Sequence, residues 1–335
     1  DRFTHMALAA AGMALSDAAL SLETEDRYRV GVWFGNNAGG WDICERGFHE
    51  LYRDGATLVN PWQATAWFPT APQGYVTIRH GIQGMSKSFV CDRASGASAL
   101  YFAERAIRLG TLDVVLAGGS EAPLTGFGMS CYAGLGELTQ RQEPSGAYQP
   151  FGVERSGFVL GEGSTVLVLE EGERAKQRGA RIYGWLEQGA MGIDPGCDAV
   201  DAWTGAFEGC LQRASWQAAD VDVVFGEGAA SVAGDRQEAQ VLTQVFGARG
   251  VPVTIPKTMY GHLYGASAVT ELAIALLSFE SGCLPPTTGT QALDPQCPVD
   301  LVLEPRSRPV RRALISSRAR EGTAVVLGVA LEESV

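Results

Sequence analysis

Residues 90–100 read Val90-Cys91-Asp92-Arg93-Ala94-Ser95-Gly96-Ala97-Ser98-Ala99-Leu100. The apolar run Ser88-Phe89-Val90 leads into them, and apolar residues at helical spacing follow as far as Leu109. This pattern predicts a strand, a tight turn and a helix. In such an elbow the residue at the turn faces the helix N-terminus, where converging backbone N–H groups can stabilise an oxyanion.

Arg93 occupies the position of the elbow where a nucleophile is expected. A guanidinium stays protonated at any working pH and offers no lone pair to a carbonyl, so it cannot attack one. Two interpretations follow from the stretch itself. It is either the scaffold of an acyl-transfer site without its nucleophile, or an ordinary turn between strand and helix that carries a surface arginine.

The composition is that of a folded α/β protein with many tight turns. The chain has 335 residues, of which 46% are apolar and 19% charged, and it contains 42 glycines. This length suffices for about two domain-sized cores. Lys and Arg number 26 against 38 Asp and Glu, so the formal net charge is −12, which argues against a nucleic-acid partner.

The cysteines indicate a reducing, cytoplasmic environment. There are seven of them, an odd number, with no CxxC or metal-type spacing. We expect them to be reduced and mostly buried, and we expect neither a metal nor a cofactor. No apolar run approaches the length of a membrane span, so no membrane partner is expected.

Strands and helices alternate along the chain, and the alternation starts again near its middle. The first series is a helix over 1–20, a strand over 28–35, a helix over 41–52, the elbow, strands over 113–121 and 164–169, a helix over 170–178 and a strand over 179–186. The second is helices over 201–215, 235–246 and 266–279 and strands over 221–225, 251–255, 301–303, 312–316 and 324–331. Two similar α/β halves are expected.

Sequence blocks spread over the chain resemble the β-ketoacyl synthases. They are Arg93-Ala94-Ser95-Gly96-Ala97, Ala117-Gly118-Gly119-Ser120-Glu121, Pro150-Phe151-Gly152, Gly157-Phe158-Val159-Leu160-Gly161-Glu162-Gly163, 257–266 and Leu284-Pro285-Pro286-Thr287-Thr288. The resemblance implies a thiolase-like fold, a five-layer αβαβα sandwich of two similar halves, residues 1–170 and 171–335. Relative to that family the opening strand is expected to be missing.

The same resemblance implies that the chain does not catalyse condensation itself. Condensing members carry a cysteine at the elbow, two histidines and a lysine. Residue by residue, the cysteine position is Arg93 and the first histidine position is Glu227, whereas the second histidine and the lysine are kept as His262 and Lys257. The loop 317–323, where condensing members carry phenylalanines, has none.

Several stretches look more like one branch, the chain length factors, or ketosynthase beta subunits, of bacterial type II polyketide synthases. They are Ala66-Trp67-Phe68, Ile78-Arg79-His80-Gly81, the run 251–259 and Tyr148-Gln149-Pro150-Phe151. The resemblance implies a heterodimer with a ketosynthase alpha subunit, an acyl carrier protein that reaches the complex, and a tunnel around the growing polyketide chain. Most members carry glutamine in place of Arg93 and arginine in place of His262, which indicates a divergent branch.

Trp41, Cys44 and Phe48 recur at helical spacing on one face of the helix 41–52. The periodicity leaves core packing and a gating role open. In the chain length factors these three positions line the tunnel, so the resemblance implies that they limit chain growth. Phe127 matches another aromatic at the tunnel end.

Arg93 and Glu227 take the places of two residues that converge in the family, so we hypothesise a buried ion pair between them. Two other functions stay open. The chain could be a stand-alone malonyl-thioester decarboxylase or acyltransferase that uses His262 and Ser95, or a homodimeric degenerate ketosynthase that acts as a scaffold.

Overall fold

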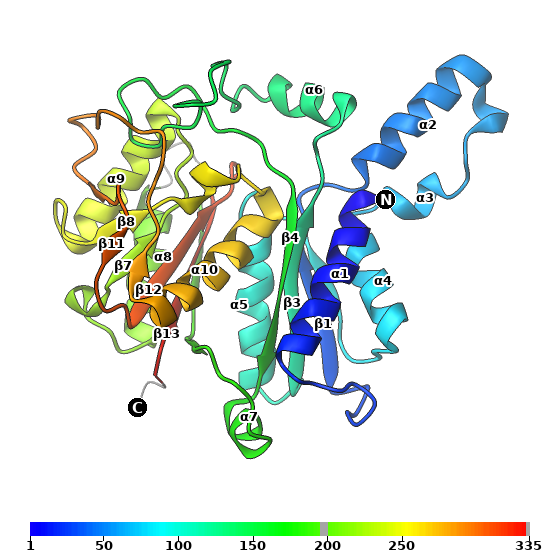
Figure 1. The fold of residues 1–335 in the computed structure, drawn as a ribbon, viewed down its shortest axis with the longest axis horizontal. Coiled ribbons are helices and arrows are strands. Elements are labelled where there is room, and N and C mark those ends of the chain that lie inside the picture. The colour runs from blue at the N-terminus through cyan, green and yellow to red at the C-terminus, as the bar shows by residue number, and fades with distance from the viewer. Residues whose placement is uncertain (195–199, 333–335) are drawn as a thin grey trace. The chain divides into compact units, whose positions relative to one another are not determined.

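The computed structural model describes residues 1–194 and 200–332 (Figure 1). They pack as two compact units. The N-terminal unit comprises Asp1–Leu135, Leu160–Arg181 and Leu263–Val269, and the C-terminal unit comprises 136–159, 182–262 and the chain from 270 onward. Because each unit takes short segments from the other part of the chain, the expected division between residues 170 and 171 stays a prediction.

The N-terminal unit is built on a four-stranded sheet with the order β2-β1-β3-β4. β1 (Val30–Gly35) pairs in parallel with β2 (Lys87–Phe89) and with β3 (Val114–Glu121), and β4 (Gly163–Glu170) is antiparallel to β3. Every residue of β1 and β3 is buried. Such unbroken apolar strands are typical of parallel sheets covered on both faces.

Helices cover both faces of this sheet (Figure 1). α5 (Ser95–Arg108) packs on β1 and β3, while α1 (Arg2–Asp17) and α4 (Ala71–His80) lie on the other side. The remaining helical elements of the unit are α2 (Trp41–Asp54), η1 (Ala56–Leu58), α3 (Gln63–Ala66), α6 (Gly126–Gly134), α7 (Gly172–Gln177) and η4 (Tyr264–Ala266). α2 follows the end of β1 and extends away from the sheet.

The C-terminal unit holds a seven-stranded sheet with the order β10-β8-β7-β12-β13-β5, and β6 also pairs with β13. The strands are β5 (Trp185–Leu186), β6 (Ala190–Ile193), β7 (Val223–Phe225), β8 (Pro252–Thr254), β10 (Asp300–Leu301), β12 (Arg312–Arg318) and β13 (Thr323–Ala330). A separate antiparallel pair joins β9 (Cys283–Leu284) to β11 (Arg306–Ser307). The parallel pairs lie around β7, and β12 and β13 form an antiparallel hairpin.

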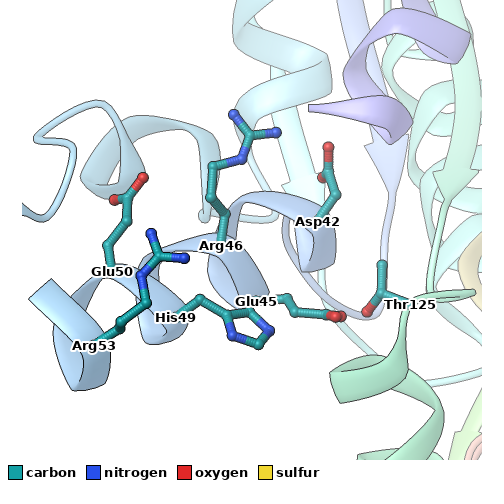
Figure 2. Close-up of a pocket in the computed structure, with 7 residues that line it drawn as sticks. All are labelled: Asp42, Glu45, Arg46, His49, Glu50, Arg53 and Thr125. Atoms are coloured by element: carbon teal, nitrogen blue, oxygen red, sulfur yellow. The ribbon is translucent and has the colours of Figure 1, made fainter.

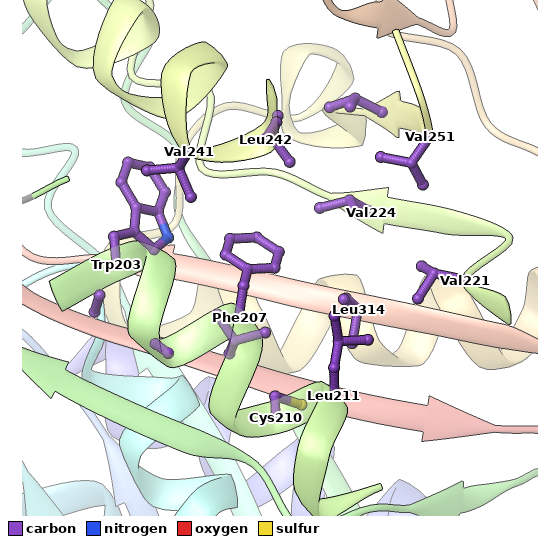
Figure 3. Close-up of a cluster of buried hydrophobic side chains, with 14 of the residues drawn as sticks. Trp203, Phe207, Cys210, Leu211, Val221, Val224, Val241, Leu242, Val251 and Leu314 are labelled. Atoms are coloured by element: carbon purple, nitrogen blue, oxygen red, sulfur yellow. The ribbon is translucent and has the colours of Figure 1, made fainter. Parts of the chain in front are cut away.

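The core of this unit lies where α8 (Val200–Arg213) and α9 (Val232–Phe246) meet the strands (Figure 3). Trp203 and Phe207 of α8 are fully buried there, and the Trp203 indole N–H donates to the Ser316 hydroxyl at 2.9 Å. The other helical elements are η2 (Ala218–Asp220), η3 (Pro256–Met259) and α10 (Ser267–Ser281), which begins in the N-terminal unit.

Most elements expected from periodicity are confirmed, but several segments differ, and the short strands β6, β9 and β11 were not expected. The strand expected over 179–186 is wrong, since only Trp185–Leu186 is a strand. α4 and α6 form where no helix was expected, because glycines interrupt the pattern in both. Among residues 1–194 and 200–332, no helix is both long and apolar enough to cross a membrane.

Candidate functional site

The elbow forms as the sequence predicts, with β2, a turn over 90–94 and α5. Asp92 adopts a positive φ of 49°, which turns the chain sharply. Ser95 closes the turn: its hydroxyl donates to the carbonyl oxygen of Asp92 at 2.6 Å and accepts the Cys91 N–H at 2.9 Å. The Ser95 side chain is therefore committed to the turn.

Small residues after the turn are required by close packing. A Cβ atom at Gly96 would lie 2.2 Å from the carbonyl oxygen of Gly265, in the segment Leu263–Val269 of the same unit. Any side chain at Gly96 would push the two segments apart.

Arg93 is buried, with only 5% of its surface exposed, so the interpretation of a surface arginine is wrong. Its Nε lies 3.4 Å from the Asp92 carboxylate. The elbow thus presents a guanidinium where an acyl-transfer site needs a nucleophile.

A second group of site residues meets in the C-terminal unit, beyond the end of β7. The Glu227 carboxylate lies 3.0 Å from His262 Nε2 and also accepts the Arg318 backbone N–H at 3.2 Å. The ring of Phe158 packs on the His262 imidazole at a centroid distance of 4.8 Å. Both oxygens of the Glu227 carboxylate are thereby hydrogen-bonded in the protein interior.

Lys257 joins this group from η3. Its ammonium donates to the carbonyl oxygens of Gly226 at 3.2 Å and Glu227 at 3.0 Å, and it forms a fully buried ion pair with Glu271 at 3.0 Å. Burial lowers the pKa of Lys257, but the carboxylates of Glu271 and Glu227 outweigh it, so the net shift is upward. Burial raises the pKa of Glu271 to about 7.

Glu238 of α9 binds the backbone of the turn that carries Glu227. Its carboxylate accepts the backbone N–H groups of Glu227 at 2.7 Å and Gly228 at 2.9 Å. Burial raises its pKa to about 8. The Glu227 turn is therefore fixed by a second carboxylate as well as by Lys257.

The expected ion pair between Arg93 and Glu227 joins residues of different units, and it stays a prediction. Within the C-terminal unit, Glu227, His262 and Lys257 do come together.

The residues expected to gate a tunnel form an aromatic cluster between α2 and α6. The Phe127 ring lies 4.9 Å from Phe48 and 5.7 Å from Trp41, between ring centroids. Trp41 also contacts Trp67 at 6.3 Å and Tyr132 at 5.7 Å. The helical face thus gathers these aromatic side chains at one place.

Burial along this face changes from one end to the other. Trp41 and Cys44 are buried, whereas 36% of the Phe48 surface is exposed. Phe48 and Phe127 line an open groove of about 540 Å³, together with Glu45, His49, Tyr52, Arg53, Gly126 and Ser130. Trp41 and Cys44 thus form the buried half of the face, and Phe48 lies in the half that is open to a ligand or partner.

Charged side chains of α2 line an adjoining hollow of about 450 Å³ (Figure 2). Its lining is Asp42, Glu45, Arg46, His49, Glu50, Arg53 and Thr125. The aromatic cluster therefore lies beside a surface of mixed charge.

Sequence reasoning missed several residues that build these sites. Glu121 is buried and accepts the N–H groups of Asn37 and Gly265, the latter at 3.3 Å, and burial raises its pKa to about 8. Asn37 in turn donates to the Tyr132 hydroxyl at 2.8 Å. Glu121 stood in one of the resembling blocks, but its partners lie far away in the sequence.

Comparison with known proteins decides the family. Residues 1–175 match the profile described as "Beta-ketoacyl synthase, N-terminal domain", and residues 189–291 match "Beta-ketoacyl synthase, C-terminal domain". The chain belongs to the β-ketoacyl synthase family.

Within this family, the chain is similar to beta subunits of polyketide synthases. It is 40% identical to the tetracenomycin polyketide synthase ketoacyl synthase beta subunit of Streptomyces glaucescens, over 96% of this chain and 80% of that protein. It is 38% identical, with the same coverage, to the actinorhodin polyketide putative beta-ketoacyl synthase 2 of Streptomyces coelicolor. The resemblance to the ketosynthase beta subunits is confirmed.

Solved ketosynthase structures share the fold. A type II polyketide synthase acyl carrier protein in complex with its ketosynthase gives a TM-score of 0.92 at 28% identity, covering 98% of this chain and 84% of that chain. The ishigamide ketosynthase/chain length factor gives a TM-score of 0.89 at 26% identity, and the match covers 99% of this chain and 82% of that chain. The thiolase-like α/β fold expected of this ketosynthase homologue is confirmed.

Proposed function

We propose that this chain is a chain length factor: a non-condensing subunit that pairs with an active ketosynthase and limits how far the polyketide chain grows. The ketosynthase supplies the nucleophile, and this chain supplies part of the tunnel wall. An acyl carrier protein delivers the growing chain to the complex.

The observation that carries the proposal is the buried guanidinium of Arg93 at the elbow. A covalent acyl intermediate needs a nucleophile at this place, a thiolate for a thioester or a hydroxyl for an ester, and the nearby Ser95 hydroxyl is bound within the turn. The first histidine position is Glu227, which hydrogen-bonds to His262. These replacements argue against the stand-alone decarboxylase or acyltransferase.

The aromatic cluster of Trp41, Phe48 and Phe127 supports the limit on chain length. Indole and phenyl rings are large and rigid, and protein interiors leave little free space around them. Tunnel space filled by these rings is closed to further two-carbon units. A smaller side chain at Trp41 therefore lengthens the tunnel.

The test is to express this chain alone and together with a ketosynthase alpha subunit, and to measure both samples by native mass spectrometry. We expect a one-to-one complex that makes polyketides, and no condensation by the chain alone. A stable homodimer that ignores the ketosynthase would overturn the proposal in favour of the scaffold.

In the active complex, Trp41→Gly is compared with Asp42→Gly, which introduces the same flexible residue into the first turn of α2 but removes no ring. Trp41→Gly is expected to give longer products, and Asp42→Gly the original ones. Unchanged product length in Trp41→Gly would contradict the gating role.

A further inference from the structure

Glu45 is a partly buried, charged residue beside the aromatic cluster, where it lines the groove together with Phe48 and Phe127. It follows Trp41 by four residues and precedes Phe48 by three, and this spacing places all three on one face of α2. A carboxylate that loses part of its hydration needs hydrogen-bond donors in exchange.

The Glu45 carboxylate binds the first turn of α6. Its Oε2 accepts the Phe127 backbone N–H at 3.0 Å, and its oxygens lie so close to Gly126 that a Cβ atom there would be 3.4 Å from Oε1. Figure 2 shows the side chain extending from α2 towards Thr125, the N-cap of α6. The positive end of a helix dipole stabilises an anion at this place.

The pKa of Glu45 supports an ionised side chain. Hydrogen bonds from the Phe127 N–H and the Thr125 hydroxyl lower it, and nearby His49 contributes in the same direction. The contact therefore persists as a charge-assisted hydrogen bond at neutral pH.

The first turn of α6 has a low intrinsic tendency to form a helix. It begins Gly126-Phe127-Gly128, and glycine has a low helix propensity. The Thr125 side chain accepts the Gly128 N–H at 3.0 Å, but that bond lies within the turn and does not join it to α2. The Glu45 bond thus fixes the backbone of the residue whose ring closes on Phe48 at 4.9 Å.

We propose that Glu45 is a positioning residue, which holds the Phe127 ring against Phe48 and Trp41 and so sets the length limit of the tunnel. This inference rests on the proposed function. It assigns part of the gating to a charged side chain that contacts α6 through the backbone and does not itself fill the tunnel.

The experiment compares product lengths from heterodimers that carry Glu45→Ala, Glu45→Gln and Asp42→Asn. Glu45→Ala removes the acceptor and is expected to raise the ratio of longer to original products by roughly tenfold, the change that loss of one charge-assisted hydrogen bond brings to an equilibrium. Glu45→Gln keeps an acceptor for the Phe127 N–H, so this variant should give products of the original length. Asp42→Asn removes a negative charge from the same helix and is expected to change nothing.

A second comparison separates positioning from general loss of structure. Phe127→Ala opens the cluster directly, so adding Glu45→Ala to it is expected to lengthen the products no further. Additive lengthening in the double variant, or equal effects of Glu45→Ala and Glu45→Gln, would overturn the inference.

Trp41→Gly is measured in parallel. If it lengthens the products while Glu45→Ala does not, the proposed function stands and the role of Glu45 fails. If neither does, the proposed gating itself fails.

Discussion

Substituting Lys257 by methionine is expected to destabilise the C-terminal unit strongly. The Lys257 ammonium and the Glu271 carboxylate are both completely buried and lie 3.0 Å apart. Methionine fills similar space but donates nothing, so it leaves the carboxylate of Glu271 and the carbonyl oxygens of Gly226 and Glu227 without this donor. Removing one partner of a buried pair costs about 3–5 kcal/mol, a large share of the roughly 5–15 kcal/mol by which domains are stable.

The double variant Lys257→Met with Glu271→Leu is expected to be more stable than Lys257→Met alone. It buries no uncompensated charge, so the two losses should fall short of additivity by about 2 kcal/mol or more. Urea unfolding of the purified protein, followed by circular dichroism, measures each variant. Lys176→Met, on an exposed lysine of α7, is the matched control and should cost less than about 0.5 kcal/mol.

The pH dependence gives an independent check. Burial raises the pKa of Glu271 to about 7 from its ordinary 4.5, so the folded state binds a proton more tightly than the unfolded state. Stability therefore falls as pH rises from 4.5 through 7. Without Lys257 the neutral form is favoured further, so the loss in Lys257→Met should be smaller at pH 6 than at pH 8. Losses that add in the double variant and do not change with pH would refute the reasoning.

Three further outcomes are expected. Glu238→Gln should flatten the fall in stability between pH 5 and 8 by up to about 1.4 kcal/mol per pH unit, because the Glu238 pKa is raised to about 8; an unchanged slope in urea midpoints would contradict this. Ser95→Ala should cost about 1–3 kcal/mol in thermal or urea unfolding by leaving the elbow turn unbound, while Ser95→Thr, which keeps the hydroxyl, loses less. If Arg93 and Glu227 form an ion pair, Glu227→Ala alone should cost several kcal/mol of unfolding free energy, and the double variant with Arg93→Ala should cost less; additive losses in a double-mutant cycle of urea unfolding would speak against the pair.

Local pattern was sufficient for most of the helices and strands and for the elbow. The apolar run before Cys91, the small residues after it and the helical spacing beyond predict β2, the turn and α5 without any long-range information. The same holds for α2, whose face of Trp41, Cys44 and Phe48 follows from a 3.6-residue period. α6 was not predicted, because its glycines weaken the helical pattern, although Thr125 is a regular N-cap residue.

Chemical identity of single residues was also readable. That Arg93 cannot be a nucleophile follows from a guanidinium at an elbow, and no fold is needed to know it. What the sequence left open was whether Arg93 is exposed. Burial depends on the segments that cover the turn, and Leu263–Val269 lies far away along the chain.

The alternation of strands and helices, the elbow and the absence of a nucleophile at its turn can be inferred from residue order, because each depends on residue identity and on neighbours close along the chain. The contacts of Glu227 with His262, of Lys257 with Glu271 and of Glu45 with the start of α6 are visible only in the folded chain. Lys257 and Glu271 are 14 residues apart along the chain, Glu227 and His262 are 35 apart, and Glu45 and Phe127 are 82 apart. No periodicity encodes such pairs, since the free energy that selects them comes from burial and charge in the folded core.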